Sequence, residues 1–210
     1  HLPLLASTLM QQLPLFLVDD DAAVLDSLSF MLTQYGYQVQ TFNSAINFCQ
    51  QVDSQQAGCV ILDSKMPEVS GQMLQQSLLE QHSPLAIIFM TGHGDLPMAL
   101  DAFSKGASDF FQKPVVGKEL VAAIEKAMLH SQQQLQQVNL QQKLALLSER
   151  ETQVLSLVIS GKTNKQMAEF LYVSLRTIEV HRAKIMKKLE VHNMAELVKF
   201  SSLIVPATTL

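Results

Sequence analysis

Short apolar runs alternate with longer amphipathic stretches through the first two thirds of this 210-residue chain. A short apolar run is typical of a strand buried on both faces, and each following stretch has the spacing of a helix that packs on a sheet. Such alternation predicts an α/β fold, in which a five-stranded, doubly wound parallel sheet carries helices on both faces. The expected strands are 13–18, 37–42, 59–62, 85–90 and 109–112, and the expected helices are 22–35, 44–50, 71–82, 96–105 and one from 117 onward.

The chain from residue 148 onward breaks this alternation and predicts a small all-α domain of four helices over 148–202. Ser148 and Glu151 have the spacing of a capping box at a helix start. Gly161 stands where a helix commonly ends, and Ser174 can cap the helix that follows. The expected helices are 149–160, 164–171, 174–189 and 194–202.

Residues 131–147 lie between the two domains and are rich in glutamine, with seven between 131 and 142. Low complexity of this kind favours a flexible linker. Yet a seam with helical spacing continues through it, at Leu120, Ile124, Ala127, Ser131, Leu135, Val138 and Gln142. We therefore expect a Gln-rich helical linker, which either pairs with a second copy or stands solvated and frayed. The remaining segments are expected to be a tag remnant or disordered start at 1–12, the first domain at 13–130 and a tail at 203–210.

Charge is divided unevenly between the two domains. The net charge of −4 argues weakly against a nucleic-acid partner. However, residues 1–147 carry 13 Asp/Glu against 6 Lys/Arg, whereas residues 148–210 carry 6 against 9. An acidic front and a basic back indicate two domains with different partners.

The two cysteines, Cys49 and Cys59, lie in apolar contexts without a nearby histidine. This favours reduced, buried thiols in a cytoplasmic protein over a disulfide or a metal site. No apolar run reaches the roughly 18 residues that span a bilayer, and the opening segment lacks the basic residues of a signal peptide. We therefore expect no membrane partner.

Polar side chains follow the predicted strands at their carboxyl ends. Asp19 and Asp20 follow the first strand, Asp63 the third, Thr91 the fourth and Lys113 the fifth. Open α/β sheets bind their ligands beyond the carboxyl ends of the strands, which lie at one edge of the sheet. These groups are therefore expected to converge.

A solvated acidic loop is the alternative for Asp19 and Asp20 taken alone. Asp63 differs, because a lone carboxylate that closes a buried strand is costly unless something pairs with it. Carboxylates without imidazole or thiolate neighbours form a hard-oxygen site, which favours Mg²⁺. With the Lys113 charge and the Thr91 hydroxyl nearby, Asp63 is the candidate nucleophile for a phosphoryl group, and the acidic pair is its metal holder.

The segments VDDD, LDSKMP, MTGHGD and DFFQKP, in this order, resemble the receiver domain of two-component response regulators, which has a flavodoxin-like fold. The resemblance implies that Asp63 is the phosphoacceptor. It also implies that Mg²⁺ is held by Asp19, Asp20, Asp63 and the backbone carbonyl of Lys65.

The same resemblance assigns roles around the phosphoryl group. It implies that Thr91 and Lys113 take part in the chemistry and that Thr91 and Phe110 are the switch residues. It further implies a cis peptide bond before Pro114.

The segment LSERETQVL and the residues that follow it to Leu189 resemble the LuxR-type helix-turn-helix, and the two domains together resemble the FixJ branch of the NarL/FixJ family. The expected helices 164–171 and 174–189 have helix-turn-helix spacing. Basic and hydroxyl side chains on the second helix are expected to contact DNA phosphates: Arg176, Thr177, Arg182, Lys184, Lys187 and Lys188. The resemblance implies that Glu179, Val180 and Ala183 face the bases.

These patterns predict a transcription regulator rather than an enzyme. A sensor histidine kinase is expected to phosphorylate Asp63, and the phosphorylated chain is expected to form a homodimer that binds double-stranded DNA. An aspartyl-phosphate phosphatase usually needs a second carboxylate two residues after the nucleophile, where this chain has Lys65. A ligand-sensing LuxR regulator would not use the Asp/Thr/Lys set, and a degenerate receiver would not retain it.

Overall fold

The computed structural model describes residues 13–92 and 96–204. The chain divides into two compact units between Leu135 and Gln136. The expected start at 1–12 and most of the tail at 203–210 lie outside the described residues. Among the residues described, no helix is both long and apolar enough to cross a lipid bilayer.

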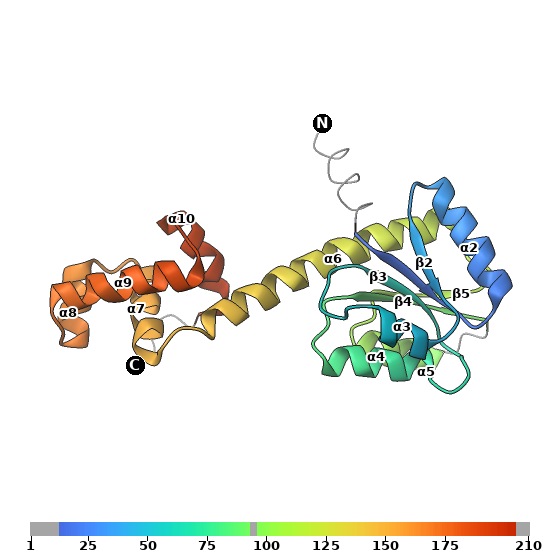
Figure 1. Ribbon diagram of the computed structural model, residues 1–210, viewed down its shortest axis with the longest axis horizontal. Coiled ribbons are helices and arrows are strands. Elements are labelled where there is room, and N and C mark those ends of the chain that lie inside the picture. Colours follow the sequence, from blue (N-terminus) through green and yellow to red (C-terminus); the bar gives the residue numbers. More distant parts are fainter. Residues whose placement is uncertain (1–12, 93–95, 205–210) are drawn as a thin grey trace. The chain divides into compact units, whose positions relative to one another are not determined.

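The first unit contains a five-stranded parallel sheet in the order β2-β1-β3-β4-β5 (Figure 1). This confirms the doubly wound α/β fold expected from the alternation of apolar runs. The first two strands are each two residues shorter than expected, because their pairing begins at Leu15 and Val39, which are partners in register. The strands are β1 (Leu15–Val18), β2 (Val39–Phe42), β3 (Cys59–Asp63), β4 (Ala86–Thr91) and β5 (Asp109–Gln112).

Helices cover both faces of this sheet, and the alternation of side chains along each strand divides the core in two. Leu15 and Leu17 of β1 pack with α2 and α6, whereas Phe16 and Val18 pack with α3, α4 and α5. The helices are α2 (Ala22–Gln34), α3 (Ala45–Gln51), α4 (Gly71–Glu80), α5 (Leu96–Ser104) and α6 (Gly117–Leu144). Because all five strands are parallel, their carboxyl ends lie together at one edge of the sheet, between the two helical layers.

Helix α6 continues through most of the Gln-rich segment, as its helical seam predicts. The first unit extends five residues beyond the expected boundary at 130. Ser131 belongs to this unit, because its buried hydroxyl accepts a hydrogen bond from Gly58 N at 2.9 Å and donates one to the Pro84 carbonyl at 2.6 Å. Within the second unit, Leu140, Leu144 and Leu147 pack against the helical core, so the segment is divided between the two units.

The second unit is all-α, as expected. The capping box of Ser148 and Glu151 is present, and Gly161 follows the helix end with a positive φ of 78°. The expected last helix tightens after Leu197 into a 3₁₀ turn, a common form at helix ends. The elements are α7 (Glu149–Ile159), α8 (Asn164–Leu171), α9 (Leu175–Leu189), α10 (Met194–Leu197) and η1 (Val198–Leu203).

Candidate functional site

Three strand ends, those of β1, β3 and β5, bring the predicted acidic and basic residues to one edge of the sheet. Val18, the last residue of β1, is in register with Leu62, and Asp63 is in register with Met90 of β4. Asp19 and Asp63 are buried side by side, whereas Asp20 is exposed. One carboxylate oxygen from each of these three residues lies within 4.8 Å of the others. We call Asp19, Asp20, Asp63 and Lys113 the strand-end cluster.

Lys113 links the two buried carboxylates of this cluster. Its Nζ lies 2.6 Å from Asp19 Oδ2 and 3.0 Å from Asp63 Oδ1. Burial raises the pKa of Asp63, and the hydrogen bond and positive charge of Lys113 oppose that effect. Burial alone would lower the pKa of Lys113, but its hydrogen bonds to Asp19 and Asp63 reverse this, so the pKa is raised overall. The ammonium group therefore stays charged between two anions.

The other carboxylate oxygens are held by backbone N–H groups. Asp19 Oδ1 accepts a hydrogen bond from Asp21 N at 2.9 Å, and Asp63 Oδ2 accepts one from Lys65 N at 3.1 Å. Asp21 itself caps α2, because its side chain accepts a hydrogen bond from Ala23 N at 2.9 Å. The three adjacent aspartates thus have three different environments, which explains how a buried strand can end in this acidic run.

The carboxylate group fits a magnesium ion by the chemistry of its donors. Asp19, Asp20 and Asp63 offer only hard oxygen atoms, and no histidine or cysteine joins them among the described residues. Mg²⁺ prefers such ligands and retains several waters, which suits a site with one exposed carboxylate.

Gly71 permits the close approach of α4 to the end of β3. A Cβ atom at this position would lie 2.3 Å from the Asp63 carbonyl oxygen and 2.9 Å from the Phe89 ring. Backbone at that distance cannot yield, so any side chain would displace α4 or the strand end. The sequence placed Gly71 only between two predicted elements. It could not show the need for glycine there, because the close contacts with Asp63 and Phe89 arise only in the folded chain.

Thr91 and Phe110 lie on neighbouring strands beside the cluster. Thr91 is buried at the end of β4, and its carbonyl accepts a hydrogen bond from Lys113 N at 2.8 Å. Phe110 on β5 is half-buried, with its ring centroid 6.1 Å from that of Phe89. The Lys113–Pro114 peptide bond is cis, as the resemblance implied.

In the second unit, α8 and α9 have the predicted helix-turn-helix arrangement. Ser174 caps α9 by accepting a hydrogen bond from Thr177 N at 3.1 Å, and Ile178, Ile185 and Leu189 are buried in the core. The opposite side of the helix is exposed. We call it the outer face of α9, and it consists of Arg176, Glu179, Val180, Ala183, Lys184 and Lys187. On this face, the Arg176 guanidinium lies 3.4 Å from the Glu179 carboxylate.

The three other residues predicted to contact DNA also have partners within the unit. The Thr177 hydroxyl lies 2.8 Å from Ser174 Oγ, and the Arg182 guanidinium donates to Asn164 Oδ1. Lys188 Nζ lies 2.7 Å from the buried carboxylate of Glu151. This ion pair and the hydrogen bond from Ser148 N lower the pKa of Glu151 to about 2. The sequence shows Glu151 only as part of a capping box, since its second partner comes from another helix.

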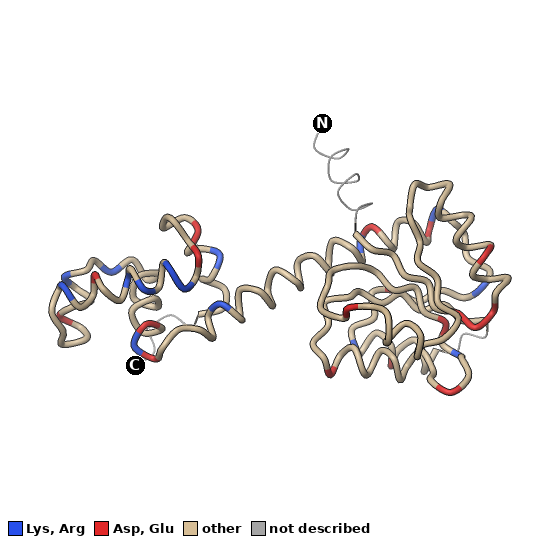
Figure 2. Tube along the Cα trace, viewed as in Figure 1, with Lys and Arg blue, Asp and Glu red and all other residues tan. Residues whose placement is uncertain are grey.

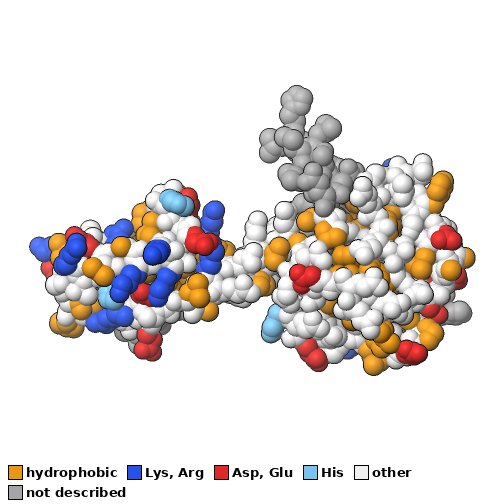
Figure 3. Space-filling model, in the orientation of Figure 1, with side chains coloured by type: hydrophobic (Ala, Val, Ile, Leu, Met, Phe, Trp, Pro, Cys, Tyr) orange, Lys and Arg blue, Asp and Glu red, His pale blue; other side chains and the backbone are white. Residues whose placement is uncertain are grey.

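The distribution of charge agrees with these two sites. Figure 2 shows lysine and arginine recurring along α9, whereas acidic positions dominate the unit that contains the sheet. In the space-filling view, the blue side chains gather over the unit that contains α9 (Figure 3).

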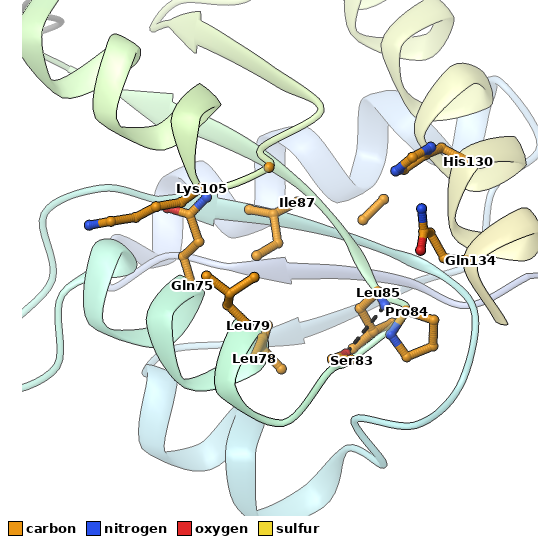
Figure 4. A pocket seen from close by; sticks show the side chains of 12 residues that line it. Gln75, Leu78, Leu79, Ser83, Pro84, Leu85, Ile87, Lys105, His130 and Gln134 are labelled. Carbon is orange, nitrogen blue, oxygen red and sulfur yellow. Dashed lines mark hydrogen bonds between the residues drawn. The ribbon is translucent and has the colours of Figure 1, made fainter. Parts of the chain in front are cut away.

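A separate cavity of about 240 Å³ lies around Leu85 and Ile87, at the amino-terminal end of β4 (Figure 4). Leu79 of α4 borders it on one side and His130 of α6 on the other. Asp63 stands at the carboxyl ends of the strands instead, and no residue of the strand-end cluster lines this cavity. The cavity is therefore not the place where the predicted chemistry would occur.

Comparisons with known families match both units. Residues 15–125 match the family described as response regulator receiver domain. Residues 145–201 match the family described as bacterial regulatory proteins, luxR family.

Named relatives are similar over nearly their whole length. The chain is 38% identical over 195 residues to the tetrathionate response regulatory protein TtrR of Salmonella typhimurium, and the match covers 92% of this chain and 95% of TtrR. It is 38% identical over 191 residues to the transcriptional regulatory protein FixJ of Bradyrhizobium diazoefficiens, a match that covers 89% of this chain and 93% of FixJ.

Solved structures of full-length relatives agree. The response regulator StyR has a TM-score of 0.68 at 38% identity, covering 90% of this chain and 98% of StyR. Full-length FixJ from B. japonicum has a TM-score of 0.56 at 37% identity, covering 91% of this chain and 96% of FixJ. Receiver domains generally bind Mg²⁺ at an acidic pocket like the one formed here, and the two domains imply a histidine kinase and DNA as partners. The chain belongs to the two-component response regulators that join a receiver domain to a LuxR-type DNA-binding domain and regulate transcription.

Proposed function

We propose that transfer of a phosphoryl group from a phosphohistidine of a sensor kinase to Asp63 switches DNA binding by α9. The observation that carries this proposal is the strand-end cluster, in which Lys113 Nζ lies 3.0 Å from Asp63 and 2.6 Å from Asp19. Packing does not require such a cluster, because buried like charges are costly to keep together. Its residues are instead those that a transferred phosphoryl group needs around it.

The transfer exchanges one bond at phosphorus for another. A carboxylate oxygen of Asp63 forms the new P–O bond while the P–N bond to the kinase imidazole breaks, and the imidazole leaves with the electron pair. The Lys113 ammonium and the Thr91 hydroxyl then bind phosphoryl oxygens. Asp19, Asp20, Asp63 and the Lys65 carbonyl would hold Mg²⁺, which supplies positive charge that stabilises the transferring group.

Recruitment of Thr91 connects this chemistry to the surface of the receiver. Once the Thr91 hydroxyl binds the phosphoryl group, the space beside it opens to the half-buried Phe110 ring. An inward turn of Phe110 repacks β5 and its neighbour α5. Two arrangements of one aromatic ring would thus report the state of Asp63.

The face made by α5, β5 and the start of α6 is the proposed dimerisation surface. Leu96, Leu100 and Phe103 on α5 are exposed, and so is Val116 just before α6. Exposed large apolar side chains on adjacent elements are typical of an interaction surface. A dimer formed there would present two copies of α9 to a two-fold operator.

DNA is the proposed partner of the outer face of α9, and it also suggests the compartment. A bacterial chromosome lies in the cytoplasm, so we place the protein there. Arg176, Lys184 and Lys187 are positioned to contact phosphates, while Val180 and Ala183 lie between them on the same exposed face.

Intact mass measurement tests the proposal directly. The full-length protein is incubated with Mg²⁺ and a small acyl phosphate, and a gain of one phosphoryl group is expected only when both are present. Peptide mapping under acidic conditions should place the group on the fragment that contains Asp63. Phosphorylation on a serine, threonine or histidine instead would contradict the assignment.

A further inference from the structure

Tyr172, in the turn between α8 and α9, has a backbone conformation that tyrosine does not favour. It forms the C-cap of α8 with φ 54° and ψ 45°, in the left-handed region. A residue with a Cβ atom is strained there, so glycine is the usual choice after a helix. The chain follows this rule at Gly36, Gly106 and Gly161, which have positive φ values after α2, α5 and α7, but not at His82 after α4 or at Glu190 after α9.

The side chain of Tyr172 does not offset this strain within the unit. It is 96% exposed, more than any other large hydrophobic side chain in the described residues. Val173, the next residue, packs against the helical core instead. His82 and Glu190 share this backbone conformation, so the strain alone assigns no function, and the almost fully exposed ring beside α9 is the feature that points to a partner. The ring of Tyr172 is therefore available to a partner outside the chain.

The surroundings of Tyr172 favour an anionic partner. One residue separates it from Ser174, the N-cap of α9, and the outer face of that helix begins at Arg176. The Arg176 side chain is 83% exposed although it pairs with Glu179, and on α8 Lys165 is exposed together with Glu169. The turn thus continues the proposed DNA surface toward α8, in a basic unit.

We infer that Tyr172 contacts the DNA backbone beside the major groove that α9 enters, with its hydroxyl donating to a phosphate oxygen and its ring lying against a sugar. Tyrosine suits this position because one end of the side chain is apolar and the other is a hydrogen-bond donor. A neutral donor adds affinity without releasing a counterion, so its effect does not depend on salt as that of a lysine does. This inference rests on the proposed role of α9 in binding DNA.

The test separates the ring from the strain of the backbone. The full-length phosphorylated protein first selects its operator from a pool of random duplexes. Tyr172→Gly should then bind both the selected and a random duplex about fivefold more weakly, with an unchanged salt slope, the loss expected for about one hydrogen bond. The same variant should unfold about 4 °C higher, because glycine relieves the left-handed backbone. Tyr172→Phe should lose part of the affinity and gain no stability.

His82→Gly is the matched control, because His82 has the same left-handed conformation, with φ 52°, after α4 in the other unit. It should stabilise its unit and leave DNA affinity unchanged. Wild-type affinity in Tyr172→Gly overturns the inference, and if transcription from the operator nevertheless falls, the ring contacts a protein instead. Failure of the proposed function is distinguishable, because the wild-type chain would then select no operator and Lys184→Ala would leave duplex binding unchanged.

Discussion

The strand-end cluster and the outer face of α9 use charge in opposite ways. Asp19 and Asp63 are buried, and each is held by Lys113 and a backbone N–H group. Lys184 and Lys187 are exposed and point away from the helical core. In the buried cluster, charged groups already surround Asp63, so the addition of one phosphoryl group would change the interactions of all of them. On the exposed helix face, each lysine is solvated on its own, so a large partner with many opposite charges is needed to engage them together.

Removal of the Asp63 carboxylate should have the largest effect, because it abolishes phosphorylation in the buried cluster. Asp63→Asn is expected to fold and to take up no phosphoryl group, since an amide cannot act as the nucleophile. Intact mass after treatment with Mg²⁺ and acyl phosphate provides the measurement. Asp26→Asn, an exposed carboxylate on α2, is the control and should be phosphorylated like the wild type. Wild-type phosphorylation of Asp63→Asn would place the phosphoacceptor elsewhere.

Loss of Lys113 should separate metal binding from signalling. Lys113→Ala is expected to retain Mg²⁺ binding, because the carboxylates remain, but to reduce the gain in DNA affinity on phosphorylation by roughly tenfold, as for one charge-assisted hydrogen bond. Mg²⁺ titration and operator binding before and after phosphorylation measure the two effects. Lys105→Ala, which breaks only the exposed pair with Asp101, serves as the control. A full response in Lys113→Ala would leave Lys113 a purely structural role.

The second unit also contains a buried charge, the Glu151 carboxylate, which pairs with Lys188. The pH dependence of stability can show how much this buried pair contributes compared with an exposed one. The partners of Glu151 lower its pKa from 4.5 to about 2, so the stabilisation is complete above pH 4.5 and is lost as the pH falls toward 2. Glu151→Gln should cost about 2 kcal/mol at pH 7, after allowance for the partial exposure of Lys188. The difference from the wild type should shrink as the pH falls from 5 to 3.

Urea unfolding of the full-length chain, followed through NMR signals of residues 148–202, provides this measurement. Glu190→Gln is the matched control, because Glu190 forms an exposed pair with Lys143 and should contribute far less. An equal cost for Glu151→Gln at pH 7 and pH 3 would show that the ion pair does not contribute to stability.

The smallest effects are expected on the outer face of α9, which Lys184→Ala and Val180→Ala test, with Lys188 as an internally paired comparison. Lys184→Ala should weaken binding to all duplexes alike and lower the salt slope by about one unit. Lys188→Ala should mainly lower stability, because its ammonium group already pairs with Glu151. Val180→Ala should instead relax base preference at one or two positions, by roughly 1 kcal/mol. If Lys184→Ala altered base preference and Val180→Ala did not, α9 would be rotated in the groove relative to our proposal.

The sequence was sufficient for the fold and the strand-end cluster because both depend on order along the chain. Apolar runs set the strands, and parallel strands bring Asp63 and Lys113 to one edge whatever the details of packing. Contacts between distant elements could not be predicted in the same way. The helical seam put Ser131 in line with Leu120, Ile124 and Ala127, but it could not show that the Ser131 hydroxyl hydrogen-bonds to Gly58 and Pro84 of the first unit.

Helix α9 shows the same limit on a smaller scale. Its basic residues were visible as a group, but the sequence alone did not divide them into exposed and internally paired ones. That division depends on how α9 packs against α7 and α8, which places Lys184 outside and Lys188 beside Glu151. Helical periodicity shows which side chains share a face of the helix, but packing against the other helices determines which face is buried.

The different environments of the three adjacent aspartates have a consequence for how this chain can evolve. Asp21 serves as a helix cap, a task that asparagine, serine and threonine perform about as well, so this position can drift among four residue types. Asp20, exposed and without a structural partner of its own in the strand-end cluster, would be constrained only by the metal. Asp19 is tied to Lys113 and Asp21 N, so even a change to asparagine would leave the lysine short of an anion. The three adjacent aspartates are therefore expected to tolerate mutation to three different degrees.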